Sequence, residues 1–468
     1  MSLSGRTDLT GQVYRQIRAA VLDGRLRDGD PLPSVRRLAS TLGISRTTVG
    51  TAYERLASEG HVRTRGGAGT YVEVPHEVAA RSAAGCSPLR ARPVWDLVAE
   101  PPVLAVLDVP YDFRLGMVDV TEFPFAAWRS LVAQQLRPGP MGNGGHIDPA
   151  GLPELRAALA RHVGVSRSVR AAPEDVVVTN GSQQAMDLLA RLLVEPGAVV
   201  AVESPGYRIS RQAFIAAGAD LVAVPVDGEG LVVDALPDAA VAVVVTPSHQ
   251  FPMGPVMSRR RRAALLAWAR RTGAAVIEDD YDSEFRYGGR PLEPLHALDQ
   301  DGHVIYVGSL SKVLLPTLRL GFAVLPPSLV PAMRRAKHVT DWHTEVPLQA
   351  AAAQFLQDGR FARHVRRMRT IYARRHHAVR AAVAEHLAGH VAAVPSHAGL
   401  HIATVFHRPR DPDAVAAAAL EHGIALHPLP AVVGNGPGML LGYGATALDR
   451  IEPGLRLLAQ VLDTLPAP

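Results

Sequence analysis

The sequence is nearly devoid of lysine and of cysteine, although it is 468 residues long. Of its 49 lysine and arginine residues only Lys312 and Lys337 are lysines, and Cys86 is the sole cysteine. A single cysteine excludes an internal disulfide and a cysteine-rich metal site. Arginine guanidinium groups stay protonated and cannot form a Schiff base, so such chemistry is left to the two lysines. Lys312 follows an apolar strand-like run, where a lone lysine is either a surface charge or a reactive amine.

Long hydrophobic runs are also missing. No stretch approaches the roughly 18 consecutive apolar residues of a membrane span, and residues 1 to 8 lack the apolar core of a signal peptide. The histidines follow no metal-ligand spacing, so we expect no bound metal. With 47% hydrophobic residues the chain suits a soluble, cytoplasmic, multidomain protein without membrane contact.

Residues 1–75 have the pattern of three short helices followed by a β-hairpin. Apolar residues recur at helical spacing from Val13 to Val21, and again after Ser34 and after Ser45, which are good N-cap residues. Gly43 separates the second helix from the third, and a glycine-rich tip lies between two strand-like pieces before Val74. The sequence therefore predicts a helix-turn-helix with a hairpin wing.

A helix-turn-helix places the start of its second helix against base edges in the major groove. Ser45, Arg46 and Thr47 occupy that position, and Arg46 is the strongest candidate for reading a guanine. Arg36 and Arg65 are candidates for phosphate contacts. Residues 1–74 hold 11 arginines and 7 acidic residues, a basic excess that favours an anionic partner. The alternative is that these helices form a dimerisation or lid domain.

Several motifs of this segment resemble the winged-helix domain of GntR-type bacterial transcription factors over residues 7–74. They are Leu32-Pro33-Ser34-x-Arg36, Gly43-x-Ser45-Arg46-x-Thr48 and Gly66-x-x-Gly69-Thr70. The resemblance implies binding to double-stranded DNA, with contacts from Arg36, Arg46, Thr47 and Gly66. Residues 76–109, which are rich in proline and lack helical or strand periodicity, are expected to form a semi-extended linker.

Residues 110–468 have the pattern of an α/β domain. Apolar strand-like runs alternate with helical patterns, as in a mostly parallel sheet; they are 176–178, 199–202, 241–245, 274–277, 304–307 and 322–325. We expect a large domain over about 145–330 and a small subdomain over about 331–468. Ligands of such sheets bind at the carboxyl ends of the strands.

Polar residues gather just past these predicted strand ends. Backbone amides of Gly181, Ser182 and Gln183 can hold a phosphate at a helix N-terminus. Acids at the end of the strand 274–277 bind metals or cap structure in many proteins, but an Asp can also keep a pyridinium nitrogen protonated. Beyond the next strand, Ser309 and Arg319 can complete a phosphate site while Lys312 supplies the amine.

Five motifs in this order resemble a fold type I aminotransferase over about residues 110–465. They are residues 175–184, Glu203-Ser204-Pro205-Gly206-Tyr207, Thr246-Pro247-Ser248-His249-Gln250-Phe251-Pro252-x-Gly254, residues 278–285 and residues 309–321. Together with the GntR-like N-terminal segment, the chain resembles a MocR/GabR-type regulator. This resemblance implies the cofactor pyridoxal 5′-phosphate (PLP). The resemblance implies that Lys312 forms the Schiff base, Asp279 pairs with the pyridine nitrogen, Tyr281 lies near the ring hydroxyl and Tyr207 stacks on the ring. It places Gly181, Ser182, Gln183, Ser309 and Arg319 around the phosphate.

One departure concerns the substrate carboxylate. Aminotransferases usually hold it with an arginine in a late strand, where this chain has Leu440. Arg208 or Arg211 could replace that arginine from another side. The effector is therefore PLP itself, as in a PdxR-type regulator, or an amino compound, and Leu440 favours PLP.

Two functions follow from the sequence. The first is a PLP-dependent transcriptional regulator of vitamin B6 or amino-acid metabolism genes, whose aminotransferase-like domain senses an effector. The second is a working aminotransferase with an attached DNA-binding domain. We expect a homodimer on an operator with repeated half-sites, because fold type I sites are commonly built at a dimer interface.

Overall fold

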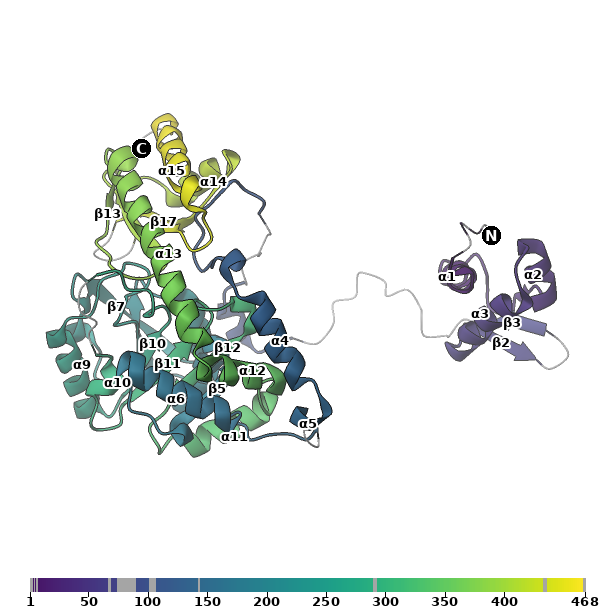
Figure 1. Ribbon diagram of the computed structural model, residues 1–468, viewed down its shortest axis with the longest axis horizontal. Helices are drawn as coiled ribbons and strands as arrows, with labels where there is room; N and C mark the ends of the chain where they lie inside the picture. The colour runs from purple at the N-terminus through teal and green to yellow at the C-terminus, as the bar shows by residue number, and fades with distance from the viewer. Residues whose placement is uncertain are drawn as a thin grey trace. The chain divides into compact units, whose positions relative to one another are not determined.

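A computed structural model describes residues 3, 5, 7–65, 69–73, 90–100, 107–141, 144–288, 293–431 and 436–465. The chain divides into two compact units, Met1–Ala91 and Arg92–Pro468, each of which is described by itself below (Figure 1). No helix among these described residues is long and apolar enough to cross a membrane.

The first unit contains the predicted helix-turn-helix and wing. Its elements are α1 (Leu9–Leu22), β1 (Pro31–Leu32), α2 (Val35–Leu42), α3 (Arg46–Ser58), β2 (Val62–Arg65) and β3 (Gly69–Val72). Ser34 and Ser45 cap α2 and α3, since their hydroxyls accept from the amides of Arg37 and Thr48. Gly43, at φ 65°, ends α2. The apolar faces of the three helices pack into one core.

The wing differs from the prediction in having a third strand. β1 pairs antiparallel with β3, which also pairs with β2. A two-residue strand that begins with Pro31 is too short to show the alternation of a strand, so it could not be predicted from the sequence. Gly66 lies outside the described residues, and so does the side chain of Arg65.

Part of the expected linker is folded. Most of residues 76–109 lies outside the described residues, but Pro93–Leu97 forms the 3-10 helix η1, which packs against α8 (Arg208–Ala217). The amide of Ala99 donates to Oε1 of Gln212, 2.8 Å away. This stretch is therefore part of the second unit rather than a tether.

The second unit is built on an eight-stranded sheet of order β5-β12-β11-β10-β9-β6-β7-β8. All six predicted strands are present, as β5 (Val176–Asn180), β6 (Val199–Ser204), β9 (Ala240–Val245), β10 (Ala275–Asp280), β11 (Val304–Ser309) and β12 (Leu320–Val324). β7 (Asp220–Asp227) and β8 (Gly230–Leu231) were not expected, and Pro225 inside β7 weakens its strand pattern.

The direction of β12 arranges the edge where the predicted site residues lie. Strands β11, β10, β9, β6 and β7 pair in parallel, whereas β12 runs antiparallel to both β11 and β5. Leu320, at the start of β12, lies opposite Asn180, at the end of β5. The segment before β12 thus meets the segments that follow β5 and β11.

Helices cover both faces of the sheet. Val176 and Val178 belong to a core with α4 (Phe125–Gln135), α6 (Pro153–Arg167) and α12 (Val346–Gln357). Val177, on the other face, belongs to a core with α7 (Gly181–Leu193), α8 and α11 (Val330–Asp341). α9 (Arg259–Thr272) completes the helical layers, and α5 (Pro138–Met141) and α10 (Leu295–Leu298) are short. The fold is that of the predicted α/β domain.

A second, smaller sheet forms the core of the small subdomain. It has the order β13-β14-β17-β16, from β13 (Val391–Ala393), β14 (His401–Phe406), β16 (His427–Leu429) and β17 (Gly438–Gly442). α14 (Pro412–Glu421) and α15 (Leu448–Thr464) pack beside it. The long helix α13 (Arg360–Ala382) runs from α12 to α15 and joins the two subdomains (Figure 1).

The two subdomains are not divided at about residue 330 as expected, because segments on each side of that point belong to the other subdomain. α11 and α12 lie beyond that point, yet their apolar residues belong to the cores of the large sheet. Conversely, β4 (Tyr111–Asp112) pairs with β15 (Ile424–Ala425) of the small subdomain. The apolar periodicity of a helix predicts that one face is buried, but it does not predict which sheet that face packs against.

Candidate functional site at the carboxyl edge of the large sheet

Lys312 lies in the turn that follows β11. Its Nζ donates to the main-chain oxygen of Gly116 at 3.2 Å. Burial lowers the pKa of this amine, against the opposing effect of Asp282 and Asp279. A lowered pKa increases the share of neutral, nucleophilic amine near neutral pH. The lysine singled out by composition is therefore in an environment suited to attack on a carbonyl.

Asp279 is a buried acid at the end of β10. Its side chain is 5% exposed, and Oδ1 has no hydrogen-bond donor among the described residues. Burial, with Asp280 and Asp282 nearby, raises the pKa of this carboxyl to about 7. A buried acceptor without a donor costs about 1–3 kcal/mol. A ligand that brings an N–H or a positive charge to Oδ1 would remove that cost.

The turn after β5 packs tightly against Arg319. Nη2 of Arg319 donates to the main-chain oxygen of Asn180 at 2.8 Å. A Cβ on Gly181, whose φ is +73°, would lie 2.9 Å from the same Nη2, and a Cβ on Gly321 would lie 2.6 Å from the carbonyl carbon of Gly181. Gly181 and Ser182 begin α7, so this guanidinium lies beside unbonded helix amides. The arrangement has the chemistry of a phosphate cradle.

Ser309 and Gln183 lie near this turn with their side chains already engaged. Ser309 is buried at the end of β11, and its Oγ accepts from the amide of Ser311 at 3.1 Å. Gln183 donates from Nε2 to the main-chain oxygen of Ile209 at 3.3 Å. Gln183 is therefore available to a phosphate through its backbone amide.

Three aromatic rings line the same edge. The ring of Phe251 lies edge-on to Tyr207 and to Tyr281, with centroids 5.4 Å and 5.9 Å away. Tyr207 is 36% exposed, and burial with the charge of Asp279 raises its pKa to about 12. Both tyrosines therefore remain protonated donors, since the pKa of Tyr281 is raised as well, chiefly by burial. No role was predicted for Phe251 from the sequence.

A buried histidine that sequence reasoning missed links Tyr281 to the small subdomain. Nδ1 of His249 lies 2.9 Å from both the Tyr281 hydroxyl and Oδ2 of Asp282. Its Nε2 lies 3.2 Å from Oγ of Ser396, in the loop between β13 and β14. A Cβ on Gly399 would lie 2.1 Å from the histidine ring. The phenol, the acid and the two subdomains therefore meet at one imidazole.

The second lysine, Lys337, stabilises the turn after β5 through hydrogen bonds. Lys337 is fully buried, and its Nζ donates to Oε1 of Gln184 and to Asp341, each at 3.0 Å. Gln184 also accepts from the amide of Asn180 at 2.8 Å. Burial lowers the pKa of Lys337, while Asp341 acts in the opposite direction. Both surviving lysines thus serve the same edge of the sheet, and only Lys312 was identified from the sequence.

Leu440 belongs to an apolar cluster close to the site. It is buried in β17 with Met253, Ala403 and Leu429, and Leu115 packs against them. Met253 follows the Phe251 segment, and Leu115 precedes the acceptor of Lys312. The position expected to hold a carboxylate-binding arginine therefore offers only apolar surface.

The first unit presents its candidate DNA contacts to solvent. Ser45, Arg46 and Thr47 at the start of α3 are exposed, as is Arg36 on α2. Neither Arg36 nor Arg46 forms an ion pair with the described residues, unlike Arg15, which lies 2.9 Å from Asp8. The predicted recognition face is accessible to an anionic partner.

Both units match families of known proteins. The family described as "Bacterial regulatory proteins, gntR family" matches residues 9–72, and "Aminotransferase class I and II" matches residues 124–437. A probable rhizopine catabolism regulatory protein, MocR, of Rhizobium meliloti is 36% identical over 96% of this chain and 92% of its own. The chain belongs to the MocR family of transcriptional regulators.

Other similarities agree with this membership. The pyridoxine biosynthesis regulator PdxR of Corynebacterium glutamicum is 32% identical over 98% of this MocR-family chain and 96% of its own. A kynurenine aminotransferase of Pyrococcus horikoshii, solved with pyridoxamine phosphate, covers 81% of this chain and 96% of its own, with 28% identity and a TM-score of 0.71. The fold implies a PLP cofactor, and the GntR domain implies DNA binding. The regulator hypothesis is favoured over a plain aminotransferase.

The unpartnered Asp279 leads to a prediction about pH. Because its pKa rises from the ordinary 3.8 to about 7 on folding, the unfolded chain ionises first and folding loses stability as pH rises through that window. Asp279→Asn cannot ionise. The PLP-free variant should therefore have a higher melting temperature than the parent at pH 8, and a smaller advantage at pH 5, while binding PLP more weakly.

Asp238→Asn is the matched control. Asp238 pairs with Arg271 on the surface, and this hydrogen bond lowers the pKa of its carboxyl. Its contribution to the stability of the fold therefore changes with pH in the opposite direction to that of Asp279. Thermal unfolding at both pH values, with and without PLP, measures the two effects. An Asp279→Asn advantage that is independent of pH would contradict the assigned cause.

Proposed function

We propose that the aminotransferase-like unit binds PLP at the edge formed by β5, β10, β11 and β12, and that its ligand state controls DNA binding by the winged-helix unit. The observation that carries the proposal is the orphaned Oδ1 of Asp279, whose carboxylate is close enough to the amine of Lys312 to act on its pKa. Two groups of complementary chemistry, an acceptor without a donor and a buried nucleophile, fit the two ends of a pyridine aldehyde. The Gly181 turn beside Arg319 supplies the third requirement, a place for its phosphate.

Each predicted residue has a part in this binding. PLP, when bound, supplies an aldehyde that condenses with amines and a ring that withdraws electrons. Lys312 would attach it, Asp279 would hold the ring nitrogen, Tyr281 would donate to the ring hydroxyl and Tyr207 would stack on the ring. The phosphate would be held by the turn and strand residues Gly181, Ser182, Gln183, Ser309 and Arg319.

The effector is better matched by PLP itself than by an amino acid bound through its carboxylate. Leu440 and its apolar neighbours provide no cation, and Nη2 of Arg211 already donates to the main-chain oxygen of Glu203. Arg208, which is exposed, is the remaining candidate for a carboxylate. The name of the Corynebacterium relative, a pyridoxine biosynthesis regulator, agrees with this assignment. The regulated genes would then belong to vitamin B6 metabolism. The protein itself would act in the cytoplasm.

A visible absorption titration with PLP tests the cofactor assignment. The parent should develop a saturable absorption band that is distinct from the spectrum of free PLP, because attachment through Lys312 changes the chromophore. Lys312→Ala and Lys312→Arg should both lack it, since a guanidinium retains the charge but cannot condense. Ser311→Ala, next to Lys312 in the same turn, should keep the band, because Ser311 contacts Ser309 through its backbone amide, which the substitution retains. A saturable band in both lysine variants would refute the role of Lys312.

The DNA assignment rests on α3. Arg46 begins this helix, is exposed, and has no ion-pair partner among the described residues. A bidentate contact between an arginine and guanine contributes roughly 1–3 kcal/mol of discrimination. Thr47 and the capping residue Ser45 would approach neighbouring bases, and Arg36, Arg65 and Gly66 would contact the backbone.

Arg46→Ala should therefore weaken binding to the operator by roughly 5- to 150-fold and reduce the preference for it over unrelated DNA. Arg15→Ala, which removes an equal charge on α1 that already pairs with Asp8, should change binding little. Fluorescence anisotropy at fixed salt compares the two. Equal losses in both variants would show that charge alone, not base contact, governs the affinity.

We also propose that the chain acts as a homodimer on two operator half-sites. A fold with one recognition helix per chain reads a repeated operator most simply in pairs. Sedimentation equilibrium of the full-length protein should give twice the mass of 49.9 kDa. A monomer at micromolar concentration, with unimpaired binding to a single half-site, would contradict this expectation.

A further inference from the structure

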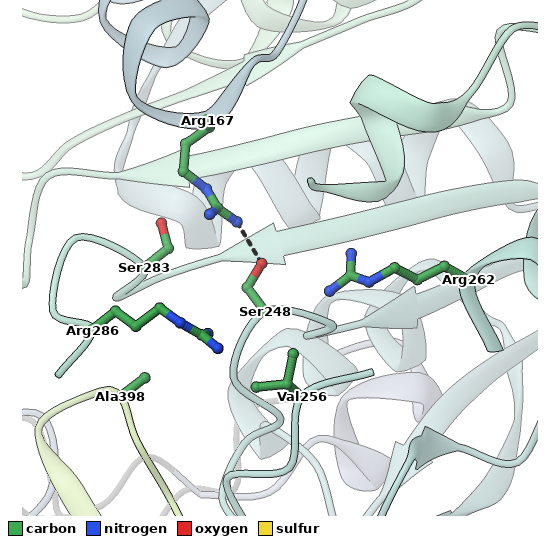
Figure 2. A pocket seen from close by; sticks show the side chains of 7 residues that line it. All are labelled: Arg167, Ser248, Val256, Arg262, Ser283, Arg286 and Ala398. Carbon is green, nitrogen blue, oxygen red and sulfur yellow. Dashed lines mark hydrogen bonds between the residues drawn. The ribbon is translucent and has the colours of Figure 1, made fainter. Parts of the chain in front are cut away.

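Three arginine side chains converge on a small cavity outside the cofactor site (Figure 2). Arg167 comes from the end of α6, Arg262 from α9, and Arg286 from the segment after β10, and all three point toward Ser248. Val256, Ser283 and Ala398 complete the described lining. The cavity leaves about 10 Å³ for the centre of a water-sized occupant, which is room for one.

Arg167 is the only one of the three with a carboxylate partner within 4 Å among the described residues. Its Nε lies 2.8 Å from Oδ2 of Asp280, and its Nη2 donates to Oγ of Ser248 at 2.5 Å. The same Oδ2 accepts from Ser283 at 3.0 Å and from Tyr306 at 2.7 Å. Oδ2 of Asp280 therefore has three donors, and among the described residues Arg167 is the only cation within 4 Å of this carboxylate.

Arg262 is held by neutral acceptors. It is 1% exposed, and its Nε, Nη1 and Nη2 donate to main-chain oxygens of Met257, Glu293 and Pro247 at 3.0, 3.0 and 2.7 Å. Burial lowers the pKa of its guanidinium, and the acid that opposes this most is the buried Glu278. Neutral acceptors hold the guanidinium in position but do not cancel its positive charge, which therefore acts on the cavity.

Arg286 is the least satisfied of the three. Its Nε is buried without an acceptor among the described residues, and no carboxylate there pairs with it. Burial, and then the charge of Arg167, lowers the pKa of Arg286. A buried donor of a charged group without an acceptor costs more than a neutral one. An acceptor with negative charge in the cavity would remove that cost.

We propose that this cavity is a binding site for one monovalent anion of chloride size. Asp280 and Glu278 are the carboxylates that act on Arg167 and Arg262, and no carboxylate of the described residues acts comparably on Arg286. Three guanidinium groups against two carboxylates leave one positive charge. The hydroxyl of Ser248 accepts from Arg167 and so has its own proton to donate toward the occupant. The small volume excludes phosphate or a carboxylic acid, and the net charge favours an anion over water.

The site lies where the two subdomains of the second unit meet. Arg286 forms a β-bridge with Ala398, which precedes β14 of the small subdomain. Ser248 precedes His249, the residue that contacts Tyr281 and Ser396. A bound anion would hold the segments after β9 and β10 and the loop before β14 together. It should therefore stabilise this junction whether or not PLP is present.

Halide dependence of the PLP-free, full-length protein tests the site. At constant ionic strength, replacing sodium gluconate by sodium chloride or bromide should raise the melting temperature saturably. Arg286→Gln should lose most of this rise. Arg270→Gln, which alters a surface arginine paired with Asp301 at 2.8 Å, should keep it.

Crystals of the parent grown in bromide provide a second measurement if Arg286→Gln fails to fold. Anomalous scattering should place a bromide ion among the three guanidinium groups. An ordered water there instead, or a halide response that survives Arg286→Gln, would overturn the proposal. Because neither measurement involves PLP, the anion site and the cofactor assignment fail independently.

Discussion

The second unit depends on how it compensates four acids buried within five residues at the end of β10. Glu278 accepts from two backbone amides at 2.9 and 3.0 Å, Asp280 from an arginine and two hydroxyls, and Asp282 from a histidine. Only Asp279 has a fully buried oxygen with no donor among the described residues. Isolated buried carboxylates are costly, so the fold has supplied a partner to each acid but one. The exception marks where a ligand completes the structure.

The topology explains why the other ligand-binding groups reach the same place. Because β12 runs against its neighbours, the residue that precedes it meets the turn that follows β5. Arg319 thus lies against Gly181 although 138 positions separate them in the numbering, and a side chain on either Gly181 or Gly321 would block the contact. Lys337 then fixes the turn through Gln184, so that the only other lysine of the chain is structural.

Sequence reasoning succeeded where the signal is local. Caps such as Ser45, the glycine that ends α2 and the apolar runs of the central strands are written into a few consecutive residues. The positions of Lys312 and Asp279 follow from the rule that ligands bind at the carboxyl ends of strands. The partners of His249 lie 33 and 147 positions away, and no local pattern reports such contacts. The same limitation hid the role of Lys337 and the assignment of α11 and α12 to the large sheet.

Regulation requires that a ligand bind two conformations with different affinity, since equal binding shifts no equilibrium. In this unit the element able to register such a difference is the contact of the two subdomains at His249. The imidazole touches Tyr281, which would meet the cofactor ring, and Ser396, which belongs to the small subdomain. A change in the hydrogen bonding of the phenol therefore alters a subdomain contact directly. An enzyme uses such closure to exclude water from a substrate, whereas a regulator without a carboxylate-binding arginine at Leu440 can use the same closure to report that its site is filled.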